Sequence, residues 1–440
     1  MSAIESSTIT ARAWLSRLLG RTFGGARDLY EVLGYTRELR AEHCYAMYLR
    51  NEIASRIVRA YPQATWRVPP IVRDEAGGTA EESAFVEAWQ DLYERMRLSH
   101  YFERTDRLAS IGHYGVLHVG INDGKPQSEP LERGSYDILY LSPYAEMHCT
   151  VQRWDMDPAS PRFGLPDLYT LQTGGGLTHT DRAATKSILV HHSRLIHVAE
   201  TLDEDEVFGV PRLKPIFNRL QDAEKVVGGS AETFWLAGNR GLAMIANADA
   251  NLDEAAKAEA KKQAEEYQHQ LRRILTVQGM DVQNLGSDTP DPSSNVDTLM
   301  SLIAGGVGIP KRILLGNEAG ELASSQDETN WNSRVEERRE QFAGPTIVRP
   351  FVRMMLDTGN LPEPQGDWWC DWDKSDGLSE KDRAEILHRK MQALQAYGAA
   401  IGGEEIIPRT EFRALAGMEP EPEGGFVEVE DDSEALDGDL

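Results

Sequence analysis

The stretch Asp297–Leu356 decides the fold and reads DTLMSLIAGGVGIPKRILLGNEAGELASSQDETNWNSRVEERREQFAGPTIVRPFVRMML. Its pattern predicts a helix, a glycine-rich break, a short apolar segment, a loop of small residues and a long helix. Ser325 with Glu328 forms a capping box that predicts the start of the long helix. Two prolines predict a kink, because each removes an interior N–H. The arrangement is more typical of a ring component than of an active site. The expected hinges are Gly305, Gly306, Gly308, Pro345 and Pro350.

Composition is typical of a soluble globular protein. The chain has 440 residues, 40% of them hydrophobic and 27% charged, which allows two to four domains. We expect no membrane association, because no window approaches the eighteen or so apolar residues of a spanning helix. Cys44, Cys149 and Cys370 are few and far apart, which favours a reducing compartment and argues against a disulfide framework or a cysteine-rich zinc site.

The chain is strongly acidic, with a formal net charge of −25. Proteins that grip nucleic acid through its phosphates usually present basic surfaces. An acidic protein either avoids nucleic acid or lets it pass without holding it.

The first half predicts an α/β domain over about 28–210. Residues 1–27 form a basic amphipathic arm, which we expect to pack on a neighbouring subunit, with DNA or membrane contact as the alternative. Helical spacing of apolar residues follows over 35–60, with Tyr61-Pro62 expected to stop the helix, and again over about 85–96. Residues 112–198 then contain several β-rich runs separated by turn residues.

The middle of the chain predicts two helices with a small module between them. Val210-Pro211 opens a long helix, and another helix restarts near Ser294. Between them lie the expected strands GLAMIA, RILTVQ and MDVQNLG and a helix over 252–273, whose surface carries Lys257, Lys261 and Lys262. The two flanking helices are therefore expected to form a stalk that carries the module.

The C-terminal part predicts a closing strand, WWCDW at 368–372, and a helix capped by Ser379 and Asp382. Residues 419–440 carry many carboxylates and no Lys or Arg, so we expect a tail without a core of its own. The fold class expected from the whole pattern is α+β.

One enzymatic alternative remains open. His148-Cys149-Thr150 and His191-His192-Ser193 match the paired elements of two-histidine phosphoesterases, in which one histidine is the base and the other the acid. Short patterns of this kind arise easily by chance, and histidines packed in a sheet explain them better. We expect no enzyme activity, no cofactor and no metal.

Three segments resemble the portal proteins of tailed bacteriophages. VHHSRLIHVAE (190–200) resembles a strand of the portal wing, and GVPRLKPIFNRLQDAEKVVGGSAETFWLAGNRGLAM (209–244) resembles the first stem helix and the start of the clip. GVGIPKRILLGNEAGELASSQDETNW (306–331) is similar to the passage from the second stem helix through the tunnel loop. A different ring-forming head–tail adaptor is a second alternative, although adaptors are generally much smaller.

The resemblance implies a portal fold with an α/β wing, a two-helix stem, a small α/β clip, a long kinked helix and a helical crown. The implied divisions are an N-terminal arm (1–27), wing (28–211 and 327–377), stem helices (212–239 and 291–311), clip (240–290), tunnel loop (312–326), crown (378–420) and acidic tail (421–440).

The resemblance also implies function. The family forms a ring, usually of twelve copies, at one capsid vertex, after assembly in the host cytoplasm. The implied partners are the terminase large subunit, a head–tail adaptor or connector, the major capsid protein and the double-stranded DNA that passes through the channel. The tunnel loop, with Asn317, Glu318, Ala319, Gly320 and Glu321, is expected to line that channel. Lys311 and Arg312 are candidates for contacts to the DNA backbone, with pairing to neighbouring carboxylates as the alternative. Lys257, Lys261 and Lys262 are expected to face a partner.

Overall fold

A computed structural model describes residues 22–23, 27–75, 83–173, 186–238, 242–246, 254–268, 280–284, 291–316, 321–373, 385 and 387–392. The chain divides into two compact units, Met1–Trp372 and Asp373–Leu440. In the second unit, the described residues 387–392 are helical, where the sequence predicts a helix. No helix in the described part of the chain is long and apolar enough to cross a membrane.

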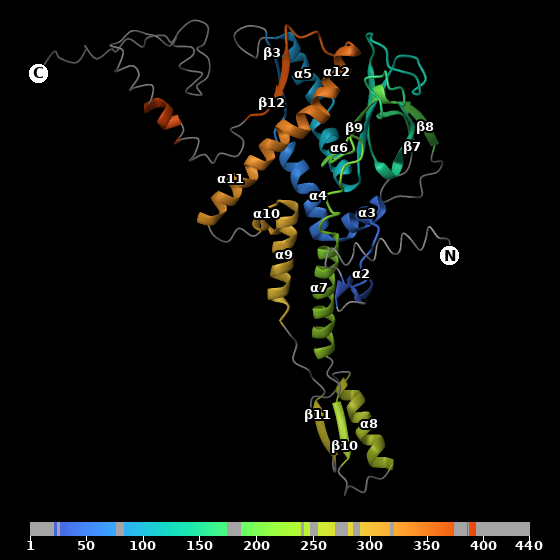
Figure 1. The fold of residues 1–440 in the computed structure, drawn as a ribbon. Helices are drawn as coiled ribbons and strands as arrows, with labels where there is room; N and C mark the ends of the chain where they lie inside the picture. The colour runs from blue at the N-terminus through green and yellow to red at the C-terminus, as the bar shows by residue number, and fades with distance from the viewer. Residues whose placement is uncertain are drawn as a thin grey trace, which may run out of the picture. The chain divides into compact units, whose positions relative to one another are not determined.

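In the first unit, helices α2 (Leu29–Val32), α3 (Ala41–Arg50) and α4 (Glu52–Thr65) precede strand β3 (Ile71–Asp74) (Figure 1). The expected stop at Tyr61-Pro62 is wrong, because Pro62 lies inside α4. The helix tolerates it near its end, where Trp66 N–H still donates to the Pro62 carbonyl at 3.0 Å. Helices α5 (Ala84–Arg95) and α6 (Leu98–Ile111) follow. As the spacing predicts, α5 buries Phe85, Trp89 and Leu92.

The β-rich region forms two three-stranded antiparallel sheets. One has the order β5-β4-β9, from β4 (Gly115–Ile121), β5 (Ile138–Ala145) and β9 (Leu195–Val198). The other has the order β6-β7-β8, from β6 (Cys149–Trp154), β7 (Pro166–Thr173) and β8 (Lys186–His191). The apolar run 186–198 therefore divides between the two sheets. The short turn η2 (His192–Arg194) separates its two strands.

A smaller pair of strands closes the unit. The predicted strand at 368–372 is confirmed as β12 (Trp368–Asp371), which pairs antiparallel with β3. The sequence did not predict strand β3, because Pro69-Pro70 and Gly77-Gly78 on either side of it are typical of turns. β1 (Thr22–Phe23) and β2 (Arg27–Asp28) form another two-stranded pair.

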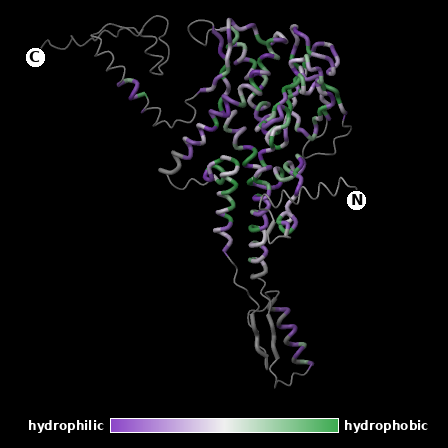
Figure 2. Tube along the Cα trace, viewed as in Figure 1, coloured by the Kyte–Doolittle hydropathy of each residue, from purple (hydrophilic) through white to green (hydrophobic). Residues whose placement is uncertain are grey.

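The two predicted stalk helices are present and lie side by side (Figure 1). They are α7 (Phe217–Gly238) and α9 (Ser293–Val307). Leu220 of α7 and Ile303 of α9 are fully buried in one core cluster, which also includes residues of α4 and α11. Figure 2 shows apolar residues gathered in α9 and hydrophilic residues along α11. The apolar stripe of α7 is only partly buried in the single chain, because Val227 and Phe234 are exposed.

The small module between the stalk helices contains β10 (Leu242–Ala246), α8 (Glu254–Gln268) and β11 (Met280–Asn284). β10 and β11 pair antiparallel, from Leu242 opposite Asn284 to Ala246 opposite Met280. The third predicted strand, RILTVQ at 273–278, lies outside the described residues.

The long helix is continuous from Glu321 to Asp357, but its hydrogen bonding changes along its length. It consists of α11 (Glu321–Arg338), a π-helical segment η3 (Arg339–Val348) and α12 (Arg349–Asp357). It begins four residues before Ser325, so the capping box does not mark its start. Trp331, Val335 and Met355 are buried, as the predicted stripe requires.

Candidate functional site

The segment after α9 contains the residues proposed from sequence to meet DNA. It continues into α10 (Lys311–Leu315), and α11 follows at Glu321. Lys311 forms an ion pair with Asp297 of α9 and donates to Ser301 Oγ at 3.2 Å. Arg312 lies 3.9 Å from the carboxylate of Asp327 on α11. Both bases are therefore already paired with nearby acids within one chain.

The expected channel loop lies mostly outside the described residues. Asn317, Glu318, Ala319 and Gly320 are not described. Glu321 is the first residue of α11. The connection between α10 and α11 spans residues 316–320, whereas the tunnel loop predicted from sequence spans 312–326.

The three glycines predicted to break the helix do not all do so. Gly305 and Gly306 are both helical residues of α9, and only Gly308 ends the helix, with φ +70°. A Cβ at Gly306 would lie 2.7 Å from Ile216 Cγ2, whereas Gly305 has open space. Gly306 therefore permits close packing of α9 on the segment before α7.

The two prolines lie within helical structure. Pro345 is inside the π-helical segment, and Pro350 occupies the first turn of α12. A π-helical segment is a known cause of helix irregularity. A proline adds to it, because its nitrogen carries no hydrogen and one backbone hydrogen bond of the helix is missing.

Four charged residues, two of them buried and two partly buried, join the long helix to the stalk. Arg338 of the long helix binds Asp106 of α6 at 2.6 Å and Glu200 at 2.8 Å. Glu200 also forms an ion pair with Arg212, just before α7. The guanidinium of Arg212 stacks over the Tyr61 ring at 4.3 Å. Burial opposes ionisation of Glu200, but the two guanidinium groups outweigh it and hold the pKa of this carboxyl below its usual range.

Sequence reasoning missed this network. A signal was present, because Arg338 stands on the apolar stripe between Val335 and Phe342, at helical spacing. A charged residue in an apolar stripe requires a buried partner. The identity of that partner depends on segments far away in the chain.

The turn between β8 and β9 is a second polar cluster. The fully buried Arg194 pairs with Asp123 at 2.5 Å and donates to the Glu129 carbonyl at 2.8 Å. Ser193 Oγ accepts the Leu131 N–H at 2.8 Å. These bonds fix the loop between β4 and β5 against the turn.

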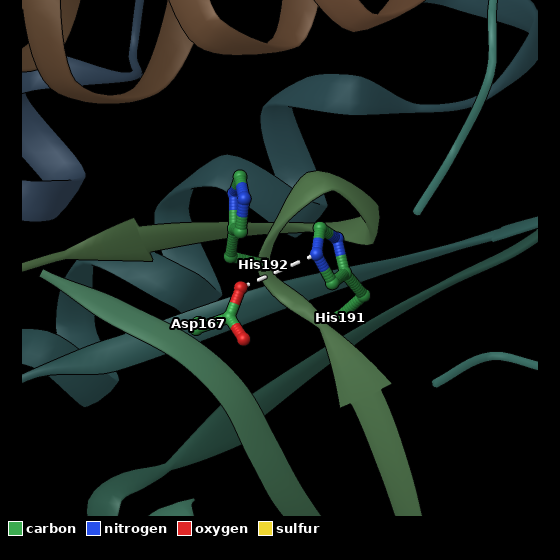
Figure 3. A group of neighbouring side chains, drawn as sticks. All are labelled: Asp167, His191 and His192. Atoms are coloured by element: carbon green, nitrogen blue, oxygen red, sulfur yellow. Dashed lines mark ion pairs between the residues drawn. The ribbon is translucent and has the colours of Figure 1, made fainter. Parts of the chain in front are cut away.

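Two consecutive histidines at the end of β8 lie near an aspartate of the neighbouring strand, and the first of them is directed at its carboxylate (Figure 3). Asp167 lies on β7, His191 ends β8 and His192 begins η2. Burial, with the nearby guanidinium of Arg162, lowers the pKa of His192 to about 4, so its ring is neutral at pH 7. Burial also lowers the pKa of His191.

The strand register argues against the two-histidine phosphoesterase. His191 pairs with Leu168 of β7, whereas Cys149, next to His148, pairs with Leu171. His148 and His191 are thus separated by roughly 10 Å along the strand direction. They are also about 10 Å apart across the sheet, because β7 lies between them. Acid and base groups of one reaction must both reach the reacting atoms, which this separation prevents.

The three lysines expected to face a partner lie on α8. Lys257, Lys261 and Lys262 are all exposed. Lys257 forms an ion pair with Glu254 at 2.8 Å. Among the described residues, no other acid forms an ion pair with these lysines.

Solved structures of similar fold come from gene transfer agent (GTA) particles. The neck of an empty GTA particle, computed with C6 symmetry, matches with a TM-score of 0.53 and 16% identity, over 85% of this chain and 92% of that one. The neck of a native GTA particle, computed with C12 symmetry, matches with a TM-score of 0.51 and 16% identity, over 86% and 94%. At this identity the likeness concerns the fold alone.

Two comparisons concern the sequence. An uncharacterized protein of Haemophilus influenzae is 26% identical over 322 residues, which cover 66% of this chain and 65% of the length of that relative. The phage portal protein family model matches residues 42–396, well over half of the chain. The chain therefore belongs to the phage portal protein family, whose members are structural, non-enzymatic components of the virion.

Proposed function

We propose that this protein assembles into a ring at one capsid vertex, through which double-stranded DNA enters during packaging and leaves during ejection. The family match over 42–396 carries the proposal. The packed pair of α7 and α9, with the β10–α8–β11 module between them in the chain, supports it as the stem and clip of such a ring.

Twelve copies is the number we favour. The native GTA neck of similar fold was computed with C12 symmetry. The half-exposed stripe of α7 is also suited to association, because Val227, Phe234 and Trp235 are apolar side chains that one chain alone leaves in water.

The negative net charge of the chain supports a channel that does not bind DNA tightly. Twelve copies at −25 each would carry a formal charge of about −300. An acidic wall repels phosphates and lets the duplex slide, whereas a basic lining releases counterions and retains it. Lys311 and Arg312 are proposed to meet the DNA backbone only transiently. The carboxylates of Asp297 and Asp327 already partner them, which supports weak contact.

The proposed partners follow the parts of the ring. The clip, with Lys257, Lys261 and Lys262 exposed on α8, docks the terminase large subunit during packaging and a head–tail connector afterwards. The major capsid protein surrounds the wing. ATP hydrolysis is left to terminase, since the sequence contains no Walker motif.

The test is direct imaging of the purified full chain by electron microscopy, with native mass spectrometry to count subunits. Rings with a central channel are expected, at twelve subunits. Compact monomers at every protein and salt concentration would overturn the proposal, and closed rings of another number would overturn only the copy number.

A further inference from the structure

The cluster of Asp167, His191 and His192 is not used by the proposed ring or by its channel. The candidate ligand atoms of the three side chains all lie within 4.8 Å of one another. Figure 3 shows the His191 ring joined to the Asp167 carboxylate by an ion pair, with the His192 ring extending away from that carboxylate. Imidazole nitrogen and carboxylate oxygen are the donors that first-row transition metals such as zinc accept.

The spacing between two of these donors suits one shared ion. His191 Nε2 lies 3.4 Å from Asp167 Oδ1. Two donors that each bind a tetrahedral ion at about 2.1 Å are about 3.4 Å apart, so the distance between this pair fits one shared ion. The His192 ring must approach by up to about 1.4 Å to complete the set, since a ligand spacing of about 3.4 Å is shorter than the 4.8 Å limit of the cluster.

Neighbouring residues bind the atoms of Asp167 and His191 that would not contact the ion. Arg153 binds the Oδ2 atom of Asp167, at 2.6 Å from its Nε, and leaves Oδ1 directed at His191. Ser193 Oγ lies 2.9 Å from His191 Nδ1. Such outer partners orient metal ligands and fix the tautomer of a ligating histidine. The His192 side chain makes no hydrogen bond to the described residues, and its ring lies against His191 with centroids 4.3 Å apart.

One proton must move for an ion to bind. The Ser193 N–H donates to His191 Nδ1 at 3.3 Å, so the neutral ring carries its proton on Nε2, facing Asp167. An ion at Nε2 takes the place of that proton, and Nδ1 becomes protonated instead. Ser193 Oγ can then accept the Nδ1–H at the same 2.9 Å.

From these contacts we propose that Asp167, His191 and His192 bind one divalent transition-metal ion, best matched by zinc, at the end of the β6-β7-β8 sheet. Three protein ligands leave one tetrahedral position for water. The ion ties β7 to the end of β8 and the start of η2, beside the Arg194 anchor. The guanidinium groups of Arg153 and Arg162 oppose a cation there, so the site is moderate in affinity rather than tight.

The experiment uses the full-length chain without an affinity tag, stripped with a chelator and titrated with Co²⁺ as a visible probe and with Zn²⁺ by calorimetry. We expect one ion per chain, visible absorption bands typical of tetrahedral Co²⁺, and loss of these bands when Zn²⁺ is added. Asp167→Asn and His192→Ala are each expected to weaken binding at least tenfold. Circular dichroism verifies that these variants fold.

Two further variants separate a built site from casual binding by surface histidines. His100→Ala, on α6 and outside the cluster, is expected to bind as the wild type does. Arg153→Gln is expected to bind more tightly, because removing a positive charge that opposes the ion outweighs the loss of the bond that orients Asp167. The proposal is overturned if Co²⁺ does not bind or binds without saturation, or if Asp167→Asn binds as the wild type does.

Discussion

Arg338 and Asp106 form a two-point ion pair in the interior of the first unit. Arg338 Nη2 lies 2.6 Å from Asp106 Oδ1, and Nη1 lies 2.9 Å from Oδ2. Asp106 also accepts the Trp66 indole N–H at 2.8 Å. The pair connects α6 to the last residue of α11, where the helix changes to π-helical bonding. It holds the long helix at a fixed position against the α/β part of the unit.

Arg338→Met is expected to lower the free energy of unfolding by about 3–5 kcal/mol, because it leaves the Asp106 charge buried without its guanidinium. Urea denaturation at one fixed protein concentration measures this, since association also contributes to stability. The matched control is Arg95→Met, because Arg95 and Asp91 are both largely exposed and such a pair contributes about 1 kcal/mol or less. Equal losses in the two variants would contradict the buried role of Arg338.

The double variant Arg338→Met with Asp106→Leu gives a second check. Removing both charges together leaves no unpaired ion, so much of the lost stability is expected to return. A double variant as unstable as the sum of the two single variants would show that the pair is not coupled.

Glu200→Gln is expected to lower stability in a pH-dependent way. The folded pKa of Glu200 lies below its ordinary value, so its contribution is fully present above the unfolded pKa of about 4.3 and is lost as pH falls further. At pH 7 we expect a loss of about 1–3 kcal/mol, which shrinks below pH 4. Urea titrations of both proteins at several pH values measure the difference, and a difference that does not change with pH would contradict this reading.

Gly306 and Gly305 are neighbours with opposite expected behaviour. Gly306→Ala places a Cβ 2.7 Å from the Ile216 methyl group, which is buried and branched and cannot easily move away. We expect it to lower stability by about 1–3 kcal/mol through overpacking. Gly305→Ala meets open space and is expected to raise stability by about 0.5–1 kcal/mol, since alanine favours a helix. Thermal unfolding of the two variants side by side tests the close approach of α9 to the segment before α7.

Deletion of residues 317–321 tests the proposed channel loop. The stem helices and the long helix carry the described packing, so ring formation is expected to persist. DNA packaging or genome retention is expected to fall. Electron microscopy of the variant and measurement of packaged DNA in particles separate the two effects. Loss of rings would assign the loop a structural role instead.

The sequence determined most of the helices, because their signals are local. Apolar spacing predicted α5, α7 and the long helix. Two starts were predicted wrongly, because α7 begins at Phe217 rather than at Val210-Pro211 and the long helix at Glu321 rather than at Ser325. The glycine at position 308 ends α9 through its left-handed backbone. The order of motifs over 190–331 was also enough to indicate the family that the sequence match then showed. Such patterns can be read from the sequence because they involve only residues within one turn or one helix of each other.

Only the tertiary structure decided how distant segments are joined. The run 186–198 looks like one strand, yet its halves enter different sheets, because Arg194 turns inward to Asp123 between them. Asp106, Glu200 and Arg338 meet from three separate parts of the chain, and Asp167 reaches His191 across two paired strands. The cost of burying a charge selects these partners, and that cost depends on which segments fold together rather than on their spacing in the sequence.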